Sequence, residues 1–225
     1  MNFWLVDSPL KFLHLWIIQL DQKIWIEHHI QSLSVKELER ARAFHFEQDR
    51  TSFINARGTM RSILGKTLSE HPSSFIFSYS PHGKPYLKEY AHIEFNLSHS
   101  GTFGLFALQL EGKKVGIDIE KIRPLNDLKD VARNFFSKTE VDKLMSTPKE
   151  IQLEAFYNCW TRKEAFIKAK GGGLSIPLDQ FEVSFLPGEN PKLINIDWDP
   201  TEIEKWELNS LKVPRGYKAA VVVEK

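Results

Sequence analysis

Two carboxylates stand two residues apart in the apolar segment VGIDIE, residues 115–120. Successive side chains of a β-strand point to opposite faces, so Asp118 and Glu120 share one face while the valine and isoleucines share the other. Neighbouring carboxylates repel each other unless water or a cation neutralises them. The segment therefore predicts either a cation site on one face of a strand or the polar outer face of a half-exposed edge strand.

A predicted helix over residues 151–170 carries a second set of charges, Lys163, Glu164 and Lys168. Apolar side chains recur along it every 3.6 residues, and the stripe that they form surrounds Lys163 and has Glu164 at its margin. A charge on a face that becomes buried needs a partner. The pattern predicts either an internal pair of Lys163 with a surface pair of Glu164 and Lys168, or a site where these charges meet a ligand.

Asp118, Glu120 and Glu164 have the side chains that a hard cation prefers. Mg²⁺ binds a few carboxylate oxygens and completes its shell with water and substrate phosphate. In the functional interpretation these three residues are the metal ligands, and Lys163 and Lys168 add positive charge beside the phosphate. The sequence thus predicts a magnesium–phosphate site.

The elements that must position these residues include both strands and helices. Strands are predicted over residues 12–20, 73–79, 92–97, 102–110, 115–119, 181–185, 206–213 and 217–224, and helices over residues 35–46, 50–64, 127–136, 138–145 and 151–170. Ser34 and Glu37 form a capping box at the start of the first helix. The glycines at 171–173 are interpreted as a C-cap, because a helix C-terminus presents carbonyl groups and disfavours an anion.

Both halves of the chain offer a strand, helices and then more strands. A polar turn at residues 111–114 lies at the middle of the chain. We therefore predict two domains, residues 1–112 and residues 113–225. The expected fold class is α+β, with two similar α/β subdomains that form a pseudo-twofold monomer and hold the active site in the cleft between them.

The composition excludes several other classes of protein. Thirty basic and twenty-nine acidic residues leave a net charge of +1, so no nucleic-acid partner is expected. Cys159 is the only cysteine, which rules out an internal disulfide and fits a reducing compartment. No apolar run reaches the roughly 20 residues of a membrane helix, and the N-terminus lacks the cationic start of a signal peptide. We expect a soluble, cytoplasmic protein without a membrane partner.

Several of these segments occur in the same order in the 4′-phosphopantetheinyl transferases, which this chain resembles. The matching segments are GKP at residues 83–85, FNLSHSG at 95–101, GIDIE at 116–120, the helix at 133–140, WTRKEAFIK at 160–168 and GGGLSIPL at 171–178. The likeness spans about residues 12–224 and is to the surfactin-type branch, whose members are monomers of two similar halves. Both the fold class and the cleft predicted above agree with that branch.

The resemblance implies a magnesium-dependent transfer of the phosphopantetheine arm from coenzyme A to a serine of an apo acyl- or peptidyl-carrier protein, with release of 3′,5′-ADP. It implies that the three carboxylates hold Mg²⁺ against the pyrophosphate of coenzyme A. It also implies that Lys84, Ser98 and His99 contact the 3′-phosphate and the adenosine. A hydrolase dyad of Ser98 and His99 is a poor alternative, because adjacent residues of an extended chain face opposite ways.

One region departs from the family pattern. Surfactin-type relatives use lysines near the first helix for the 3′-phosphate, whereas this chain has Glu37 at one such place and Arg40 at another. Arg57 and Arg61 lie one turn apart on the next helix and offer bidentate guanidinium groups for phosphate. Arg40 and Arg57 are therefore expected to bind the co-substrate. The alternative is a solvated basic helix face, and Phe53 replaces a hydroxyl residue of some relatives.

The implied mechanism gives separate tasks to two residues of the last helix. Lys168 would stabilise the leaving group or transfer a proton, and the serine proton would go to Glu164 or to a metal-bound water. Carrier proteins of this kind are acidic helical bundles, so a basic surface beside the cleft is expected. Phe135, Phe136 and Lys138 are the candidates for docking, and an ordinary amphipathic helix is the alternative.

Two rival functions remain open from the sequence. A phosphohydrolase would use the same carboxylates with water as the nucleophile, and would release free phosphopantetheine. A non-catalytic protein that binds coenzyme A or a carrier would have no need to retain the acidic set. The sequence does not distinguish carriers of fatty-acid, polyketide or nonribosomal peptide biosynthesis.

Overall fold

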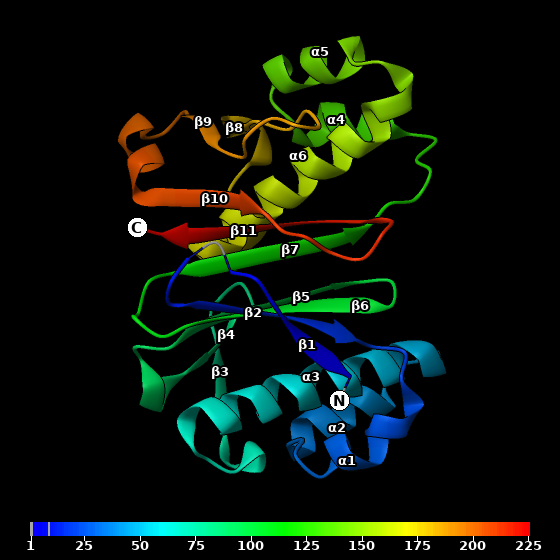
Figure 1. The fold of residues 1–225 in the computed structure, drawn as a ribbon, viewed down its shortest axis with the longest axis vertical. Coiled ribbons are helices and arrows are strands. Elements are labelled where there is room, and N and C mark those ends of the chain that lie inside the picture. The colour runs from blue at the N-terminus through cyan, green and yellow to red at the C-terminus, as the bar shows by residue number, and fades with distance from the viewer. Residues whose placement is uncertain (1, 9) are drawn as a thin grey trace.

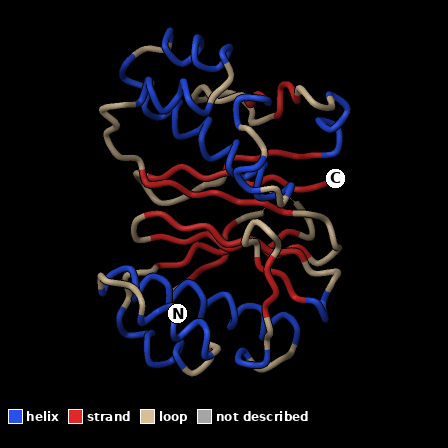
Figure 2. Tube along the Cα trace, turned by 180° about the vertical axis from the view of Figure 1, so that it is seen from behind, coloured by secondary structure: helices blue, strands red, loops and turns tan. Residues whose placement is uncertain are grey.

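Two antiparallel sheets lie in the middle of the molecule, and a helical layer covers the outer face of each (Figure 1). The computed structural model describes residues 2–8 and 10–225. Seen from behind, the strands again lie between two groups of helices (Figure 2). The fold is α+β with two subdomains, as the sequence predicted, and the strands of each large sheet come from one half of the chain.

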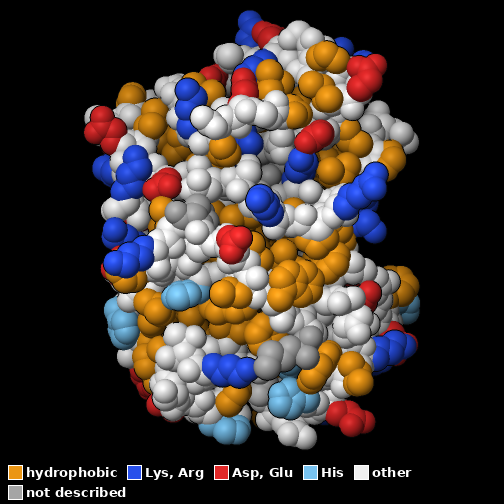
Figure 3. Space-filling view, viewed as in Figure 1, with side chains coloured by type: hydrophobic (Ala, Val, Ile, Leu, Met, Phe, Trp, Pro, Cys, Tyr) orange, Lys and Arg blue, Asp and Glu red, His pale blue; other side chains and the backbone are white. Residues whose placement is uncertain are grey.

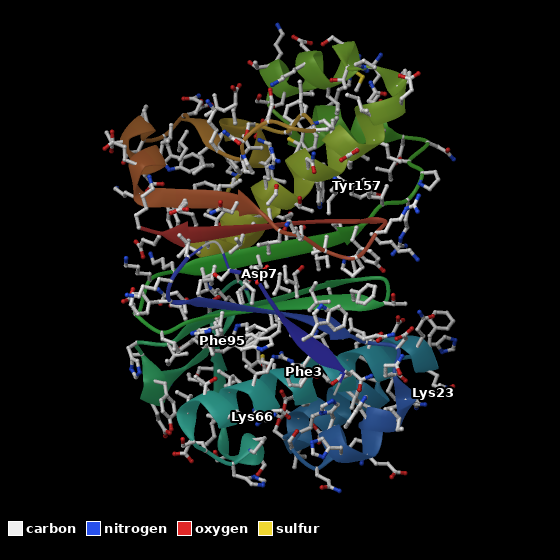
Figure 4. All side chains as sticks on the ribbon, viewed as in Figure 1. Phe3, Asp7, Lys23, Lys66, Phe95 and Tyr157 are labelled. Carbon is white, nitrogen blue, oxygen red and sulfur yellow. The ribbon has the colours of Figure 1, made fainter. Side chains whose placement is uncertain are left out.

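The N-terminal half forms a four-stranded sheet in the order β1-β2-β6-β5. Its elements are β1 (Phe3–Val6), β2 (Leu13–Gln19), α1 (Ile26–Ile30), α2 (Val35–Arg42), α3 (Glu47–Leu68), β3 (Phe77–Tyr79), β4 (Pro85–Leu87), β5 (Glu94–Ser100) and β6 (Phe103–Gln109). The long helix α3 packs its apolar face on this sheet. Phe95, for example, lies on the α3 side of β5 (Figure 4), and it is buried there beside Met60 and Phe106.

The C-terminal half forms a three-stranded sheet in the order β10-β11-β7. Its elements are β7 (Val115–Lys121), α4 (Leu128–Phe135), α5 (Lys138–Ser146), α6 (Lys149–Lys170), β8 (Phe181–Val183), β9 (Leu193–Ile196), β10 (Trp206–Ser210) and β11 (Tyr217–Glu224). The helix α6 crosses this sheet and buries Ala165 and Phe166 against Val222. A third apolar core joins the inner faces of the two sheets, where Leu105 packs with Ile117 and Val221.

The helix starts agree well with the sequence, and the ends agree less well. Both hydrogen bonds of the capping box between Ser34 and Glu37 are present. The second helix was predicted to end near Gly65, and this prediction is wrong. The helix α3 continues to Leu68 and ends at Ser69, which has a φ of 57°. A Cβ on Gly65 would lie 2.8 Å from the carbonyl oxygen of Glu70, so this glycine permits the returning chain to pack on the helix.

Three strands were not predicted from the sequence, and another is longer than predicted. The short strands β1, β4 and β9 exist because they pair with β2, β3 and β8, and such pairing is not visible in local sequence. The strand predicted at 92–97 continues to Ser100, and the turn falls at Gly101, which has a φ of 58°. The motif residues Ser98 and His99 therefore lie on a strand and not in a loop.

The surface agrees with the near-neutral composition. On the face drawn in Figure 3, basic and acidic side chains are interspersed around a central apolar region. Within the part of the chain that the structure describes, no helix is long and apolar enough to cross a membrane. The predicted boundary at residues 112 and 113 stays a prediction, although the chain passes from one large sheet to the other between β6 and β7.

Candidate active site

The strands β5 and β7 are edge strands of the two sheets, and polar side chains of β5 bridge to β7. The amide oxygen Oδ1 of Asn96 accepts the backbone N–H of Ile117 at 2.9 Å. Two residues further along β5, the hydroxyl of Ser98 donates to Oδ1 of Asp118 at 2.8 Å. Because side chains alternate along a strand, both residues face the C-terminal half.

Ser100 continues this series toward the second strand carboxylate. Its hydroxyl donates to Oε2 of Glu120 at 2.6 Å and accepts the backbone N–H of Lys121 at 3.1 Å. The N-terminal half therefore supplies a hydroxyl to each of the carboxylates that the sequence predicted on one face of β7. Asp118 is only 2% exposed, so the alternative of a solvated edge strand does not apply to it.

Gly116 brings the helix α6 close to β7. A Cβ at this position would lie 2.1 Å from the carbonyl oxygen of Ala165 and 2.1 Å from the amide nitrogen of Ala169, so only glycine fits. The close approach places Lys168 over the strand, where its Nζ atom lies 2.6 Å from Oδ1 of Asp118. The Nζ atom is also 3.2 Å from the hydroxyl of Ser98.

The charges around Lys168 keep it protonated. Burial alone would lower the pKa of this amine, but the charge of Asp118 and the hydrogen bond to it act in the opposite direction, and the pKa is raised. Glu164, one turn earlier on α6, lies 4.0 Å from Lys168 and adds to this effect. The site therefore holds one fixed cation among three carboxylates.

The remaining carboxylates are destabilised as anions. Burial raises the pKa of Glu164, and the charges of Asp118 and Glu120 raise it further, against the effect of Lys168. Burial likewise raises the pKa of Glu120, with a contribution from Asp118. These mutual effects show that the predicted metal ligands lie within electrostatic reach of one another.

The donor set fits a hard cation, although the structure does not assemble a complete metal site. Among the residues described here, no three histidine, cysteine or carboxylate side chains lie close enough together to hold a metal ion. Lys168 instead neutralises Oδ1 of Asp118. The other oxygen, Oδ2, is buried and has no hydrogen-bond partner within the described ranges. An oxygen of this kind is available to a cation, which supports the assignment of carboxylates as ligands.

Lys84 lies at a cavity between the two halves. Its Nζ atom donates to the carbonyl oxygen of Val115 at 2.9 Å and to Oε2 of Glu94 at 3.2 Å. Burial lowers the pKa of Lys84, against the effect of Glu94. The cavity has a volume of about 200 Å³ and is also lined by Lys168 and Gly171. Lys84 thus connects the turn before β4 to the start of β7.

His99 faces away from the carboxylates, on the same side of β5 as Phe95. It is exposed. Desolvation of the imidazole ring lowers the pKa of His99, and the positive charges of Lys168 and Arg57 lower it further. His99 therefore stands within electrostatic reach of both the carboxylate cluster and the basic helix face, and the structure does not pair it with Ser98.

A groove between α2, α3 and β3 contains both arginines that the sequence assigned to the co-substrate. It has a volume of about 530 Å³ and is lined by Arg40, Arg57 and Phe53, among other residues. Arg57 is largely buried and donates from Nη2 to the hydroxyl of Tyr79 at 3.1 Å. Arg40 is exposed. The arginines therefore line a recess, which differs from the alternative of a freely solvated helix face.

Lys163 does not lie at the site, and its assignment to the co-substrate phosphate is corrected here. The side chain is fully buried, and Nζ lies 2.7 Å from Oε2 of Glu140. It also donates to the carbonyl oxygen of Leu178 at 2.6 Å and to that of Phe181. The internal ion pair that the apolar stripe predicted as an alternative is the arrangement found.

Of the three candidate docking residues, one is buried and two are accessible. Phe136 is only 2% exposed and stacks in the core beside Phe156, so it is unable to contact a partner. Phe135 is 38% exposed and packs edge-on against Trp160. Lys138 is exposed at the start of α5. Two of the three candidates thus remain accessible.

Sequence reasoning missed several residues of this site. Asn96 and Ser100 were read only as parts of a motif, although their spacing around Ser98 shows that the three share a face. Gly116 was likewise only part of a motif, and Glu94 carried no signal, because the importance of these two residues depends on contacts with α6 and with Lys84. Local sequence indicates a face of a strand but not the element that covers it.

Comparisons with known proteins agree with the geometry. The model of the 4′-phosphopantetheinyl transferase superfamily matches residues 114–222, and a model of the N-terminal part of 4′-phosphopantetheinyl transferases matches residues 21–111. The chain therefore belongs to the 4′-phosphopantetheinyl transferases and is an enzyme of that family.

Individual relatives show to which branch of the 4′-phosphopantetheinyl transferases the chain belongs. The chain is 39% identical over 184 residues to the 4′-phosphopantetheinyl transferase HetI of Nostoc sp.. This alignment covers 80% of this chain and 77% of the relative. It is 32% identical over 195 residues to the 4′-phosphopantetheinyl transferase Sfp of Bacillus subtilis, covering 87% and 84%. A solved holo-(acyl-carrier-protein) synthase from Bacillus anthracis is 20% identical, with a TM-score of 0.39 over 49% of this chain and 94% of that chain. The identities to HetI and Sfp show that the enzyme is of the Sfp type.

Proposed function

We propose that the enzyme moves the phosphopantetheine arm of coenzyme A to a serine hydroxyl of an apo acyl- or peptidyl-carrier protein, and that it requires Mg²⁺. The observation that carries this proposal is the cluster of Lys168, Asp118 and Ser98, which joins three elements at the seam between the halves. Glu120 and Glu164 border the cluster. It combines a fixed cation with oxygen ligands, as a site for pyrophosphate requires.

The reaction forms a bond from the serine oxygen to the phosphorus that bears the arm. The bond from that phosphorus to the bridging oxygen of the pyrophosphate breaks, and 3′,5′-ADP leaves with the electron pair on that oxygen. Mg²⁺ held by Asp118, Glu120 and Glu164 would neutralise negative charge on the pyrophosphate. Lys168, which the surrounding carboxylates keep protonated, offers a hydrogen bond to the leaving oxygen.

The serine proton needs an acceptor in the same cluster. Glu164 and a metal-bound water are the two candidate bases, and because a carboxylate that binds a metal is a weaker base, the water is favoured wherever Glu164 binds Mg²⁺. The pairing with Lys168 at 4.0 Å is loose and leaves its oxygens accessible to a second partner. The proton would move from the serine hydroxyl to an oxygen of Glu164 that does not bind the metal, or to a metal-bound water.

The nucleotide end of coenzyme A is assigned to the N-terminal half. Arg40 and Arg57 line a recess that suits a terminal phosphate. His99 lies within electrostatic reach of Arg57 and Lys168, and Lys84 lies at the cavity that Lys168 shares. We assign residues 1–112 to nucleotide contacts and residues 113–225 to the metal site and to carrier docking. A monomer suffices, because one chain supplies every residue of the cluster.

The carrier protein is assigned to the surface around the start of α5. Lys138 is exposed there, and Phe135 is partly exposed on the preceding helix. A basic side chain beside an apolar one suits an acidic helical partner. If Lys138→Glu leaves the KM for an apo-carrier unchanged, this residue does not belong to the docking surface.

The test uses the purified enzyme with coenzyme A, Mg²⁺ and a panel of apo-carriers from fatty-acid, polyketide and peptide synthesis, read by mass. The wild type should add one phosphopantetheine arm to at least one carrier. Asp118→Asn and Glu164→Gln should reduce the rate by about three orders of magnitude, as loss of a transition-state contact does. The exposed Asp7→Asn should behave as the wild type.

Two outcomes would overturn the assignment. Normal transfer by Asp118→Asn or Glu164→Gln would exclude the metal-ligand and base roles. Free phosphopantetheine released without any carrier would indicate a phosphohydrolase. Removal of divalent cations with a chelator should stop transfer, and added Mg²⁺ should raise the melting temperature of the wild type more than that of Asp118→Asn, because a ligand stabilises the state that binds it.

A further inference from the structure

The groove between α2, α3 and β3 holds an excess of positive charge. Four basic side chains and one carboxylate line it, together with the aromatic rings of Phe53, Phe75, Phe77 and Tyr79. Two of the basic side chains, Arg40 and Arg57, are the ones that face Phe53. An anion is therefore the expected occupant of the groove, and how the cations are held decides which anion fits.

Glu37 pairs most closely with Arg61, and its other oxygen, Oε1, lies 3.8 Å from Nε of Arg57. Oε2 of Glu37 lies 2.9 Å from Nε and 2.7 Å from Nη2 of Arg61, which is 1% exposed. The remaining nitrogen, Nη1, donates to the carbonyl oxygens of Pro72 and Phe75. Every nitrogen of the Arg61 guanidinium is thus occupied by the protein itself, and this arginine is unable to bind a ligand.

Arg40 is exposed, whereas Arg57 directs one N–H of Nη2 to Tyr79 and one N–H of Nη1 to the sulfur of Met60, which leaves the second N–H of each nitrogen for a ligand. One aromatic ring lies against both arginines. The Cζ atom of Arg40 is 5.4 Å from the centroid of Phe53, and that of Arg57 is 5.9 Å from the same centroid. Phe44 packs against Phe53 with 5.5 Å between ring centroids and limits its movement. Cation–π attraction to a common ring offsets the repulsion between the two guanidinium groups.

We propose that Phe53 is a positioning residue that holds Arg40 and Arg57 together for a terminal phosphate monoester, which in the proposed reaction is the 3′-phosphate of coenzyme A. The inference rests on the proposed function for the identity of the donor. Because the guanidinium groups and Phe44 already pack against the ring, Phe53 acts through the two arginines and not by stacking on a base. It thereby sets the preference of the enzyme for a donor that carries the 3′-phosphate.

Two measurements separate this role from a purely structural one. Calorimetry gives the affinity for adenosine 3′,5′-bisphosphate, which is the product 3′,5′-ADP. It also gives the affinity for adenosine 5′-monophosphate, which lacks the 3′-phosphate. Transfer assays compare coenzyme A with 3′-dephospho-coenzyme A. The variants are Phe53→Leu, which removes the ring, and Phe53→Tyr, which keeps it. Phe46→Leu serves as the matched control, because Phe46 is 64% exposed at the start of the same helix.

For Phe53→Leu we expect the Kd for adenosine 3′,5′-bisphosphate and the KM for coenzyme A to rise about tenfold, which corresponds to the loss of two cation–π contacts. The kcat value, the affinity for the monophosphate and the rate with the dephospho donor should change less than about twofold, since those ligands do not reach the arginines. Phe53→Tyr and Phe46→Leu should match the wild type.

Other results would overturn the inference. If Phe53→Leu weakens both nucleotides equally, or neither, the ring has only a packing role. If the wild type binds both nucleotides equally, no phosphate site exists in the groove. Because binding is measured without a carrier, a wild type that distinguishes the nucleotides but transfers nothing would refute the proposed function and leave the role of Phe53 supported.

Discussion

The ammonium nitrogen of Lys168 on α6 lies 2.6 Å from the carboxylate oxygen Oδ1 of Asp118 on β7. The hydroxyl of Ser98, on the edge strand of the other half, donates to the same oxygen at 2.8 Å. One buried oxygen therefore connects the helix that carries the cation, the strand that carries the carboxylates and the opposite half of the molecule. Disturbing either of these two contacts should affect catalysis before it affects the fold.

Replacement of the cation is the most direct test of this arrangement. Lys168→Met should lower kcat by at least about a hundredfold, because a preorganised charge at the reacting phosphate stabilises the transition state. Lys170→Met is the matched control, since Lys170 lies on the same helix and pairs with Glu202 outside the site. A kcat of Lys168→Met within about threefold of that of Lys170→Met would remove Lys168 from the mechanism.

Gly116→Ala should damage both stability and activity. The added Cβ would meet backbone atoms of Ala165 and Ala169 at 2.1 Å, and backbone is unable to move aside as a flexible side chain does. Overpacking of this kind costs about 1–3 kcal/mol, and the displaced helix would separate Lys168 from Asp118. Chemical denaturation and transfer assays would measure the two effects.

Gly104→Ala is the matched control for that substitution, because its Cβ would meet its nearest neighbour at 3.4 Å. It should cost less stability than Gly116→Ala and leave the rate unchanged. Equal behaviour of the two variants would show that the close approach of α6 has no special importance.

Lys163→Met should act on stability alone. Removing the amine leaves Glu140 buried without its charge partner, and breaking such a pair costs about 3–5 kcal/mol. The double variant Lys163→Met/Glu140→Gln should recover part of this loss, since it removes the uncompensated charge. In both variants kcat per folded molecule should stay near the wild-type value. A stable Lys163→Met protein with a raised KM for coenzyme A would instead support the phosphate contact rejected above.

The stability of the enzyme should decrease in mild acid because of His29. Burial, with a smaller effect of the neighbouring His28, lowers the pKa of His29 to about 4. The folded state therefore resists protonation that the unfolded chain accepts below its usual pKa of about 6.5. The contribution of neutral His29 to the free energy of unfolding is fully present above pH 6.5 and decreases as the pH falls toward 4. The expected loss between pH 7.5 and pH 5 is about 2 kcal/mol.

The control for this prediction is the variant His29→Gln, which has no group to protonate. Its free energy of unfolding should change less over the same interval than that of the wild type. The matched control is His92→Gln, which replaces an exposed histidine and should behave as the wild type does. Parallel pH profiles for all three proteins would show that other groups cause the acid sensitivity.

Much of the architecture was readable from local patterns. The capping box of Ser34 and Glu37 predicted the start of α2, and the alternation in VGIDIE predicted a strand on which Asp118 and Glu120 share one face. These features depend on interactions within a few residues, so spacing alone specifies them. The end of α3 was missed because Gly65 serves a contact with Glu70 and does not terminate the helix.

The sequence by itself determined the family and the two-part α+β fold, and it predicted the three carboxylates with Lys168 as the reactive set, because types and spacings along single elements carry that information. Only the tertiary structure decided that Lys163 is an internal ion-pair partner, that Ser98 and Ser100 hold the carboxylates, and that Phe53 lies against two arginines. Each of these joins elements far apart in the chain. Helix and strand periodicities fix the direction of a side chain, whereas packing between elements fixes its partner.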